Sequence, residues 1–222
     1  MAHAYPAPIA GRHPGWPASL GGLRVSAGVV ALRPVRLRDG RTWSAIRIRD
    51  ERYLAPWEPS MPGGWAQRHA ASEWPARWLQ LRGAGRRGAV LPFAITLDGR
   101  FVGQVMVGNV VREPLLSAYV GYWVDSSVAG RGVTTAAVAL VVDHCFGRVG
   151  LHRLEATVRP ENLASIRVLE KLGFRKEGLF RRYLDVDSAW RDHYCYALTV
   201  EDLEKTGGLT TRLVVEGRAE RV

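Results

Sequence analysis

Cysteine is scarce in this sequence of 222 residues, which contains only Cys145 and Cys195. Two cysteines are too few for a disulfide-stapled domain, and their spacing is not that of metal ligands. We therefore expect both thiols to be reduced and to have no catalytic role. Long apolar runs are also lacking, since none approaches the ~18 residues that a membrane-spanning helix needs. The N-terminus lacks the charged start and continuous apolar core of a signal peptide. We therefore expect a cytoplasmic protein without membrane contact.

Acidic residues are few, because 21 Asp and Glu stand against 31 Lys and Arg and give a formal net charge of +10. This balance favours an acidic partner, such as RNA contacted through a basic surface, or an anionic cofactor. No block of five or more consecutive basic residues occurs, however. An arginine-rich protein without nucleic-acid contact is therefore an equal alternative.

Composition divides the chain into three parts. Residues 1–28 contain no acidic residue and several prolines and glycines, which predicts an irregular N-terminal extension. Residues 29–204 carry the regular patterns of one domain, and the hydrophobic fraction of 47% is ample for a buried core. Residues 205–222 are predicted to form a polar C-terminal tail without assigned structure.

Periodicity within the middle part predicts strands and helices in an α+β order. Asp98-Gly99 is a typical hairpin turn between two strands, and Pro75 is expected to kink or break a helix. The predicted strands cover residues 29–38, 89–97, 101–111, 117–124, 152–159, 174–184 and 192–200, and the predicted helices cover residues 42–54, 64–82, 133–146 and 162–172.

Five of the eight tryptophans lie between residues 43 and 78, with arginines on either side. Such a cluster fits aromatic residues of the core beside solvated arginines. It also fits the aromatic wall of a substrate groove with a basic rim. The sequence leaves both interpretations open.

One short stretch carries the clearest chemical signal, and it joins the 117–124 strand to the 133–146 helix. Its sequence is Val128-Ala129-Gly130-Arg131-Gly132-Val133-Thr134-Thr135. Glycines let the backbone approach a ligand closely, and a helix N-terminus offers unpaired N–H groups and partial positive charge. The stretch therefore predicts a phosphate site. It is neither a Walker loop nor a full dinucleotide fingerprint, because Gly-Lys-Ser/Thr is absent and Thr135 replaces the third glycine.

A second motif is longer and more specific. It is the run Arg159-Pro160-Glu161-Asn162-Leu163-Ala164-Ser165-Ile166-Arg167-Val168-Leu169-Glu170-Lys171-Leu172-Gly173-Phe174. Together with the glycine loop, the order of elements and the strand end Gly121-Tyr122-Trp123-Val124-Asp125, it resembles the GNAT superfamily of acetyltransferases over residues 30–204. Within that superfamily it resembles the RimJ/RimL branch, which acetylates the N-terminal amines of ribosomal proteins. The resemblance implies a GNAT-type mixed, mostly antiparallel central sheet flanked by helices, with acetyl-CoA in a cleft where two strands splay apart.

The resemblance also implies roles for particular residues. Asn162 would bind the pantetheine arm, although it equally fits a simple helix N-cap. Ser165 would protonate the leaving thiolate or merely cap the helix, and the backbone N–H near Val124 would stabilise the oxyanion. The pyrophosphate would be held by the main chain of Gly130, Arg131, Gly132, Val133 and Thr134. In the superfamily pattern Gln/Arg-x-x-Gly-x-Gly/Ala only Gly132 matches, but main-chain donors tolerate such replacements.

The expected acid and base are less evident. Leu169 stands where many family members have a tyrosine, and Leu184 stands where RimL-like enzymes have a carboxylate. Asp185 is adjacent to Leu184 but should point to the other face of its strand. Glu113 and Asp125 are other carboxylates near the central strands, and each fits either a base or a solvated loop charge. A site without a dedicated base suits an N-terminal α-amine, because roughly a tenth to a sixth of it is neutral at pH 7, against about 1 in 2,500 lysines.

The resemblance thus implies an acetyl-CoA-dependent N-acetyltransferase, whose acceptor is the N-terminal α-amine of a protein, with a ribosomal protein favoured. The amine would attack the thioester directly. One alternative is an acetyltransferase of a small-molecule amine, such as an antibiotic or polyamine, although a basic surface should repel polycations. The other alternative is a non-catalytic CoA-binding or RNA-associated regulatory module, suggested by the missing tyrosine and carboxylate.

Overall fold

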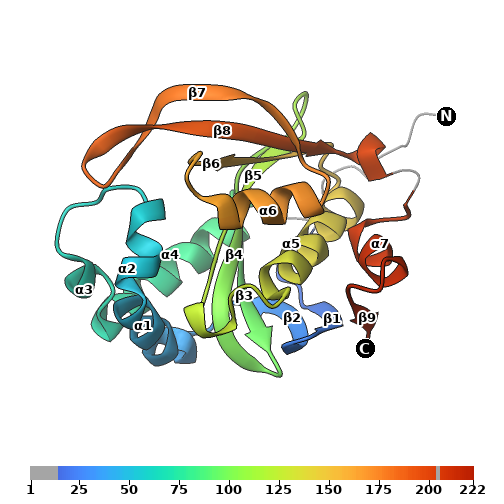
Figure 1. Ribbon diagram of the computed structural model, residues 1–222. Helices are drawn as coiled ribbons and strands as arrows, with labels where there is room; N and C mark the ends of the chain where they lie inside the picture. Colours follow the sequence, from blue (N-terminus) through green and yellow to red (C-terminus); the bar gives the residue numbers. More distant parts are fainter. Residues whose placement is uncertain (1–14, 204–205) are drawn as a thin grey trace.

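The computed structural model describes residues 15–203 and 206–222. The strands in this part of the chain are β1 (Leu20–Val25), β2 (Gly28–Pro34), β3 (Leu91–Leu97), β4 (Arg100–Val111), β5 (Ser117–Val124), β6 (Arg153–Val158), β7 (Arg175–Val186), β8 (Ala189–Thr199) and β9 (Glu220–Arg221). They form one sheet in the order β7-β8-β6-β5-β4-β3-β2-β1-β9 (Figure 1). Neighbours run antiparallel except β5 and β6, which are parallel. The mixed, mostly antiparallel sheet expected from the sequence is confirmed.

Helices cover both faces of this sheet. The α-helices are α1 (Gly40–Arg49), α2 (Glu51–Leu54), α3 (Trp65–Arg68), α4 (Trp74–Arg86), α5 (Val133–His144), α6 (Leu163–Lys171) and α7 (Leu209–Val215). Short 3₁₀ turns are η1 (Leu37–Asp39), η2 (Ala55–Trp57), η3 (Ala71–Glu73), η4 (Ser126–Val128) and η6 (Val200–Leu203), and a π-helical turn, η5 (Cys145–Val149), follows α5. The helices α1 to α4 gather on one side of the sheet, whereas α5, α6 and α7 lie on the other (Figure 1). None of the helices in the described residues is long and apolar enough to cross a membrane.

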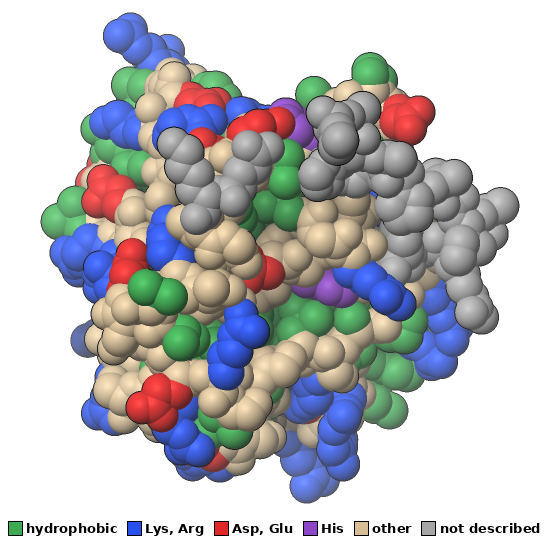
Figure 2. Space-filling model, turned by 90° about the vertical axis from the view of Figure 1, so that its right-hand side faces the viewer, with side chains coloured by type: hydrophobic (Ala, Val, Ile, Leu, Met, Phe, Trp, Pro, Cys, Tyr) green, Lys and Arg blue, Asp and Glu red, His purple; other side chains and the backbone are tan. Residues whose placement is uncertain are grey.

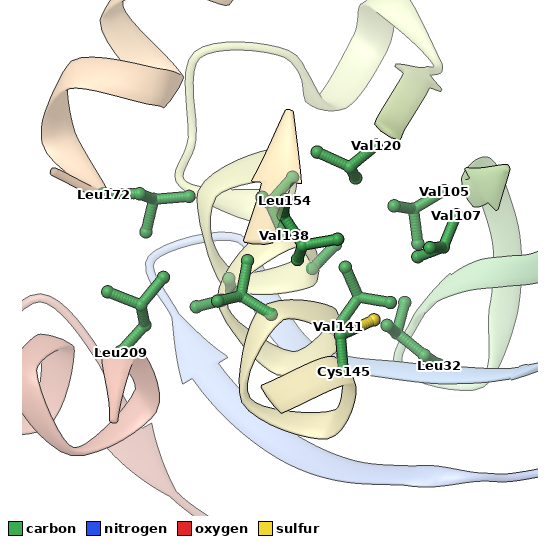
Figure 3. Close-up of a cluster of buried hydrophobic side chains, with 14 of the residues drawn as sticks. Leu32, Val105, Val107, Val120, Val138, Val141, Cys145, Leu154, Leu172 and Leu209 are labelled. Carbon is green, nitrogen blue, oxygen red and sulfur yellow. The ribbon is translucent and has the colours of Figure 1, made fainter. Parts of the chain in front are cut away.

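The larger core lies between the sheet and α5. Val138 and Val141 of α5 are fully buried, and they point toward Val105 of β4 and Leu154 of β6 in the same cluster (Figure 3). Because α6 and α7 enclose the remaining sides, α5 is apolar almost all round. Cys145 lies in this core, where burial raises the pKa of its thiol. The core holds the N-terminus of α5 rigidly against the ends of the central strands.

A smaller core packs α1 and α4 against the opposite face of β3 and β4. The rings of Trp43 and Trp74 lie 5.0 Å apart, and both side chains are buried. Most of the tryptophan cluster is therefore core. The helix expected over residues 64–82 is broken just before Pro75, as that proline predicted, because α3 ends at Arg68 and α4 begins at Trp74. Pro75 occupies the first turn of α4, where its missing N–H costs nothing.

The two ends of the chain contain more structure than their composition suggested. The irregular extension expected over residues 1–28 is wrong for its last part, because Leu23 is buried and strand β1 pairs with β2. Residues 1–14 of that expectation lie outside the described part of the chain. The polar tail expected over residues 205–222 instead forms α7 and β9. Leu209 of α7 enters the main core beside Leu172 (Figure 3), and β9 extends the sheet beyond β1.

Candidate functional site

The site begins where the two parallel strands separate. Pairing between β5 and β6 runs from Ser117↔Arg153 to Tyr119↔Glu155, and beyond this point the strands diverge. A cavity of about 710 Å³ lies against the first turns of α5 and α6, and a second, of about 200 Å³, lies between the diverging strand ends. The two cavities share four lining residues, which are Trp57, Tyr122, Asn162 and Ser165.

The glycine loop forms one wall of the larger cavity. Gly130 and Gly132 both adopt positive φ angles, 74° and 83°, and Gly132 is the N-cap residue of α5. The first N–H groups of a helix have no acceptor within it, so those of α5 are available to a ligand. Gly130, Gly132 and Thr134 line the cavity, whereas Arg131 has an exposed side chain and Val133 is buried in the core. The two glycines thus leave main-chain N–H groups of this wall accessible to a ligand, as a phosphate site requires.

The first turn of α6 forms the facing wall. The Asn162 side-chain oxygen accepts a hydrogen bond from the Ser165 N–H at 3.0 Å, so Asn162 is the N-cap of this helix. Its amide also lines both cavities, and the capping and ligand roles are compatible. Leu163 is 58% exposed, and it leaves an apolar surface at the cavity that an alkyl chain would cover.

Tyr122 is a functional candidate that no sequence motif indicated. Its hydroxyl lies 2.8 Å from Ser165 Oγ, and burial raises its pKa, so the phenol stays protonated. Leu169, where many family members carry a tyrosine, is fully buried in the core. A phenol therefore reaches the site from β5 instead of α6. Strand alternation was the available signal, because it places Tyr122 on the same face as Val124.

The backbone of Val124 is suitably placed to stabilise negative charge. The Asp125 N–H donates to the Val102 carbonyl of β4 at 2.7 Å. Successive N–H groups of a strand point to opposite edges, so the Val124 N–H points away from β4, toward the side on which β6 has diverged. Val124 also lines the larger cavity. This orientation is the one that an oxyanion donor needs.

The three carboxylates considered as bases are all occupied elsewhere or distant. Asp125 accepts hydrogen bonds from the Arg49 guanidinium and from the Ser127 N–H, and thereby caps η4. Asp185 accepts from the Ser60 hydroxyl at 2.8 Å. Glu113 lies exposed in the turn between β4 and β5. None of these three residues is among those that line the two cavities.

Charged side chains around the larger cavity favour an anion. The three basic residues are Arg52, Arg167 and Lys171, and the acidic residues are Glu58 and Glu161. Both carboxylates are already paired with arginines of the same region, Glu58 with Arg47 and Glu161 with Arg159. The rim consequently carries a surplus of positive charge.

An aromatic wall closes the cavities on the side of α2 and η2. The Arg159 guanidinium stacks on the Trp57 ring at 5.5 Å and donates to the Pro56 carbonyl at 2.9 Å. These contacts tie η2 to the end of β6 and hold Trp57 beside both cavities. One member of the tryptophan cluster thus lines the site, whereas Trp43, Trp65 and Trp74 are buried.

A buried arginine supports this wall from behind. The Arg47 guanidinium lies between the rings of Trp65 and Trp123, at 4.7 and 5.0 Å, and forms an ion pair with Glu58. It also donates to His69 Nε2 at 2.9 Å. The arrangement joins α1, α3 and β5 at the segment that carries Trp57.

Comparison with known proteins assigns the class. The family profile described as an acetyltransferase (GNAT) domain matches residues 30–175. This match spans well over half of the chain, and the sheet order, the splayed strands and the glycine loop agree with it. The chain belongs to the GNAT acetyltransferase family and is an N-acetyltransferase of the RimJ/RimL type. The family resemblance seen in its motifs is confirmed.

Individual relatives show which members of the family this chain is similar to. The solved structure of Mycobacterium smegmatis RimJ in complex with CoA-disulfide is 55% identical, with a TM-score of 0.92, and the match covers 95% of this chain and 100% of that one. The ribosomal protein uS5-alanine N-acetyltransferase of Escherichia coli is 28% identical over 81% of this chain and 92% of its own length. The probable N-acetyltransferase YjcK of Bacillus subtilis is 44% identical, but the match spans 49% of this chain and only 60% of that protein.

The basic side chains that composition led us to expect as a surface patch do not form one on the face that carries α7 and the C-terminus. Figure 2 shows Lys and Arg side chains there interspersed with Asp and Glu. Ion pairs such as Arg212–Glu216 and Arg218–Glu216 belong to this region. RNA contact accordingly stays a prediction from net charge alone.

Proposed function

We propose that this enzyme transfers the acetyl group of acetyl-CoA to the N-terminal α-amine of a protein, with a ribosomal protein that begins with alanine as the favoured acceptor. The observation that carries this proposal is the meeting of two cavities at Tyr122 and Ser165. A donor and an acceptor approaching from separate cavities would meet there without any covalent enzyme intermediate. Neither buried cysteine lines either cavity.

The larger cavity fits CoA by the chemistry of its walls. The main chain from Gly130 to Thr134 would hold the pyrophosphate, and the surplus of basic side chains at the rim would attract its phosphates. Asn162 would bind the pantetheine arm. When bound, acetyl-CoA supplies a thioester whose acetyl group is activated for attack by an amine. The Val124 N–H would stabilise the carbonyl oxygen as it gains charge, and Ser165 would donate a proton to the departing sulfur.

The smaller cavity suits a small first residue. Its volume of about 200 Å³ and its apolar lining by Ala156 and Val158 leave room for a short side chain. This agrees with the name of the Escherichia coli relative, which specifies an alanine of ribosomal protein uS5 as the acceptor. The similarity to Mycobacterium smegmatis RimJ, which was solved in complex with CoA-disulfide, covers 95% of the chain and supports the use of CoA beside this acceptor cavity.

The chemistry of the amine favours an N-terminus over a lysine. An α-amine has a pKa of about 7.7–8.0 and a lysine side chain about 10.4, so the neutral fraction near pH 7 differs by several hundred-fold. No carboxylate lines the smaller cavity. The site therefore has little means of deprotonating a lysine.

Acetylation of matched peptides tests the proposal. A peptide beginning with alanine should gain one acetyl group on its α-amine at pH 7. The same peptide with a blocked N-terminus and a free internal lysine should be nearly inert at pH 7, and its rate should climb toward pH 9. Mass spectrometry locates the products. Preferential lysine acetylation at pH 7, or faster acetylation of a free polyamine, would overturn the α-amine assignment.

A further inference from the structure

The smaller cavity contains one group that no motif pointed to. His193 of β8 lines this cavity together with Tyr122 and Ser165, and its side chain is only 4% exposed. The ring packs against Tyr183 of β7, with centroids 5.6 Å apart. His193 is thus a buried imidazole in the cavity proposed for the acceptor, where it could exchange a proton with the substrate.

Hydrogen bonding fixes the tautomer of this ring. His193 Nδ1 lies 3.1 Å from the Arg191 carbonyl oxygen, which can only accept, so Nδ1 carries the proton. In the neutral ring the lone pair is then on Nε2. This atom belongs to the distal end of the ring, away from the β8 backbone, and within the described residues it has no hydrogen-bond partner. It can therefore accept a proton from a group in the cavity.

The other side chains that line the cavity cannot take this role. Arg159 is a guanidinium that remains protonated, and it is held by the Pro56 carbonyl and Glu161. The Tyr122 phenol stays protonated because it is buried. Asn162, Ser165 and Thr157 are neutral and very weakly basic. Among the lining residues only His193 offers a basic lone pair.

The surroundings keep the imidazole neutral. Burial lowers the pKa of His193, and the nearby Arg159 guanidinium acts in the same direction. The Arg191 carbonyl and the carboxylates of Glu161 and Asp192 oppose this shift without reversing it. The ring is thus in its proton-accepting form at pH 7.

We propose that His193 Nε2 is the general base that accepts a proton from the acceptor ammonium, directly or through a water in the smaller cavity. This role rests on the function proposed above. The nitrogen must lose two protons in all. The first passes to His193 and frees the lone pair; the N–C bond then forms as the thioester C–S bond breaks. The second proton ends on the sulfur through Ser165, and His193 returns its proton to solvent.

Such a base preserves the preference for α-amines. Proton transfer to a histidine whose pKa is lowered is uphill from both amines, but from a lysine it is uphill by about 2.5 pKa units more than from an α-ammonium. The histidine can assist the first and is ineffective for the second.

The experiment compares wild type, His193→Ala and His193→Gln on the alanine-initiated peptide. The matched control is His152→Ala, because His152 is a half-exposed histidine that pairs with Glu201 and lines neither cavity. We expect kcat of both His193 variants to fall about 100-fold at pH 6–7, while the acetyl-CoA Kd stays within about threefold. The loss should shrink strongly by pH 9, where the peptide amine is already neutral. Added imidazole should restore His193→Ala but not His193→Gln.

Each outcome has a separate meaning. An unchanged kcat, or a loss that is equal at pH 6 and pH 9 and is not rescued by imidazole, would overturn the base assignment. Thermal melts show whether a variant is folded, and the glutamine variant covers the case in which alanine destabilises β8. Failure of the wild type itself to acetylate the α-amine, with normal acetyl-CoA binding, would instead overturn the proposed acceptor.

Discussion

The hydroxyl of Tyr122 lies 2.8 Å from Ser165 Oγ, and this contact bridges β5 and the first turn of α6 across the opening between the strands. The contact changes the interpretation of Ser165. The cap of α6 is made by the Asn162 side chain on the Ser165 N–H, so the serine hydroxyl is not needed to begin the helix. Its partner is a phenol that can return a proton to it. We therefore favour the proton-donor role for Ser165.

Replacement of Ser165 by alanine should reduce turnover and leave stability nearly unchanged. We expect kcat to fall about 10- to 100-fold, because a thiolate would leave without its proton donor, while the acetyl-CoA Kd changes little. Tyr122→Phe should show a smaller loss, since the serine hydroxyl remains. Steady-state kinetics, calorimetric titration and a melt on each variant give the three readouts. A lowered melting temperature with normal kcat would show a structural role instead.

Asn162→Ala, unlike Ser165→Ala, should lower the stability of the protein. It removes the oxygen that accepts from the Ser165 N–H, so unfolding should become easier by about 1 kcal/mol. If the same amide also binds the pantetheine arm, the acetyl-CoA Kd should rise as well. Urea denaturation and calorimetry separate the two effects. A stability loss without any change in Kd would restrict Asn162 to capping.

Gly132→Val should block the approach of pyrophosphate to the start of α5. The residue has a φ of 83° and lines the larger cavity, so a branched side chain strains the loop backbone that would carry the phosphate donors. Its Cβ would already lie 3.5 Å from Val25 of β1, so the strain is relieved only by a shift of that backbone. We expect the acetyl-CoA Kd to rise about tenfold or more, whereas Arg131→Ala should raise it only slightly.

Gly99→Val is the matched control for this prediction. Gly99 has a nearly equal φ of 80° but lies in the hairpin between β3 and β4, away from both cavities. Its replacement should cost stability without weakening acetyl-CoA binding. Unchanged affinity in a folded Gly132→Val protein would contradict the phosphate-loop assignment.

The strands and helices of the middle of the chain were predictable because their signals are local. Asp98-Gly99 has the two positive φ angles that its sequence implies, and Asn162 and Gly173 bound α6 as cap and C-terminal glycine. The glycine loop was located for the same reason. The donors proposed for the pyrophosphate belong to its main chain, so imperfect side-chain matches do not weaken the assignment.

Features that depend on distant contacts could not be predicted from the sequence. Strand β1 and helix α7 are short and only weakly periodic, and each is stabilised by packing on elements far away in the chain. Tyr122 and His193 lie in strands whose pattern predicts which face they occupy but not what that face adjoins. The divergence of β5 and β6 opens the cavity that both residues line together with Ser165.

We expect the free energy of unfolding to decrease in mild acid, because His69 is buried beside Arg47. His69 Nδ1 lies 2.8 Å from the Trp65 carbonyl and therefore donates to it, which leaves Nε2 to accept from Arg47. Burial lowers the pKa of His69 to about 4, and the Arg47 charge acts in the same direction. A protonated ring would lose the Arg47 hydrogen bond and face its charge.

The sign of the effect follows from proton binding. Between pH 4 and 6.5 the unfolded chain binds a proton at His69 that the folded protein does not, so the free energy of unfolding rises with pH in this window. The contribution is complete above pH 6.5 and is lost as the pH falls toward 4. From pH 7 to pH 5 the loss amounts to about 2 kcal/mol. Urea denaturation of wild type and His69→Gln at both pH values isolates the contribution of His69, because glutamine does not titrate. The wild type should lose about 2 kcal/mol more than His69→Gln. Equal losses in the two proteins would contradict the lowered pKa of His69.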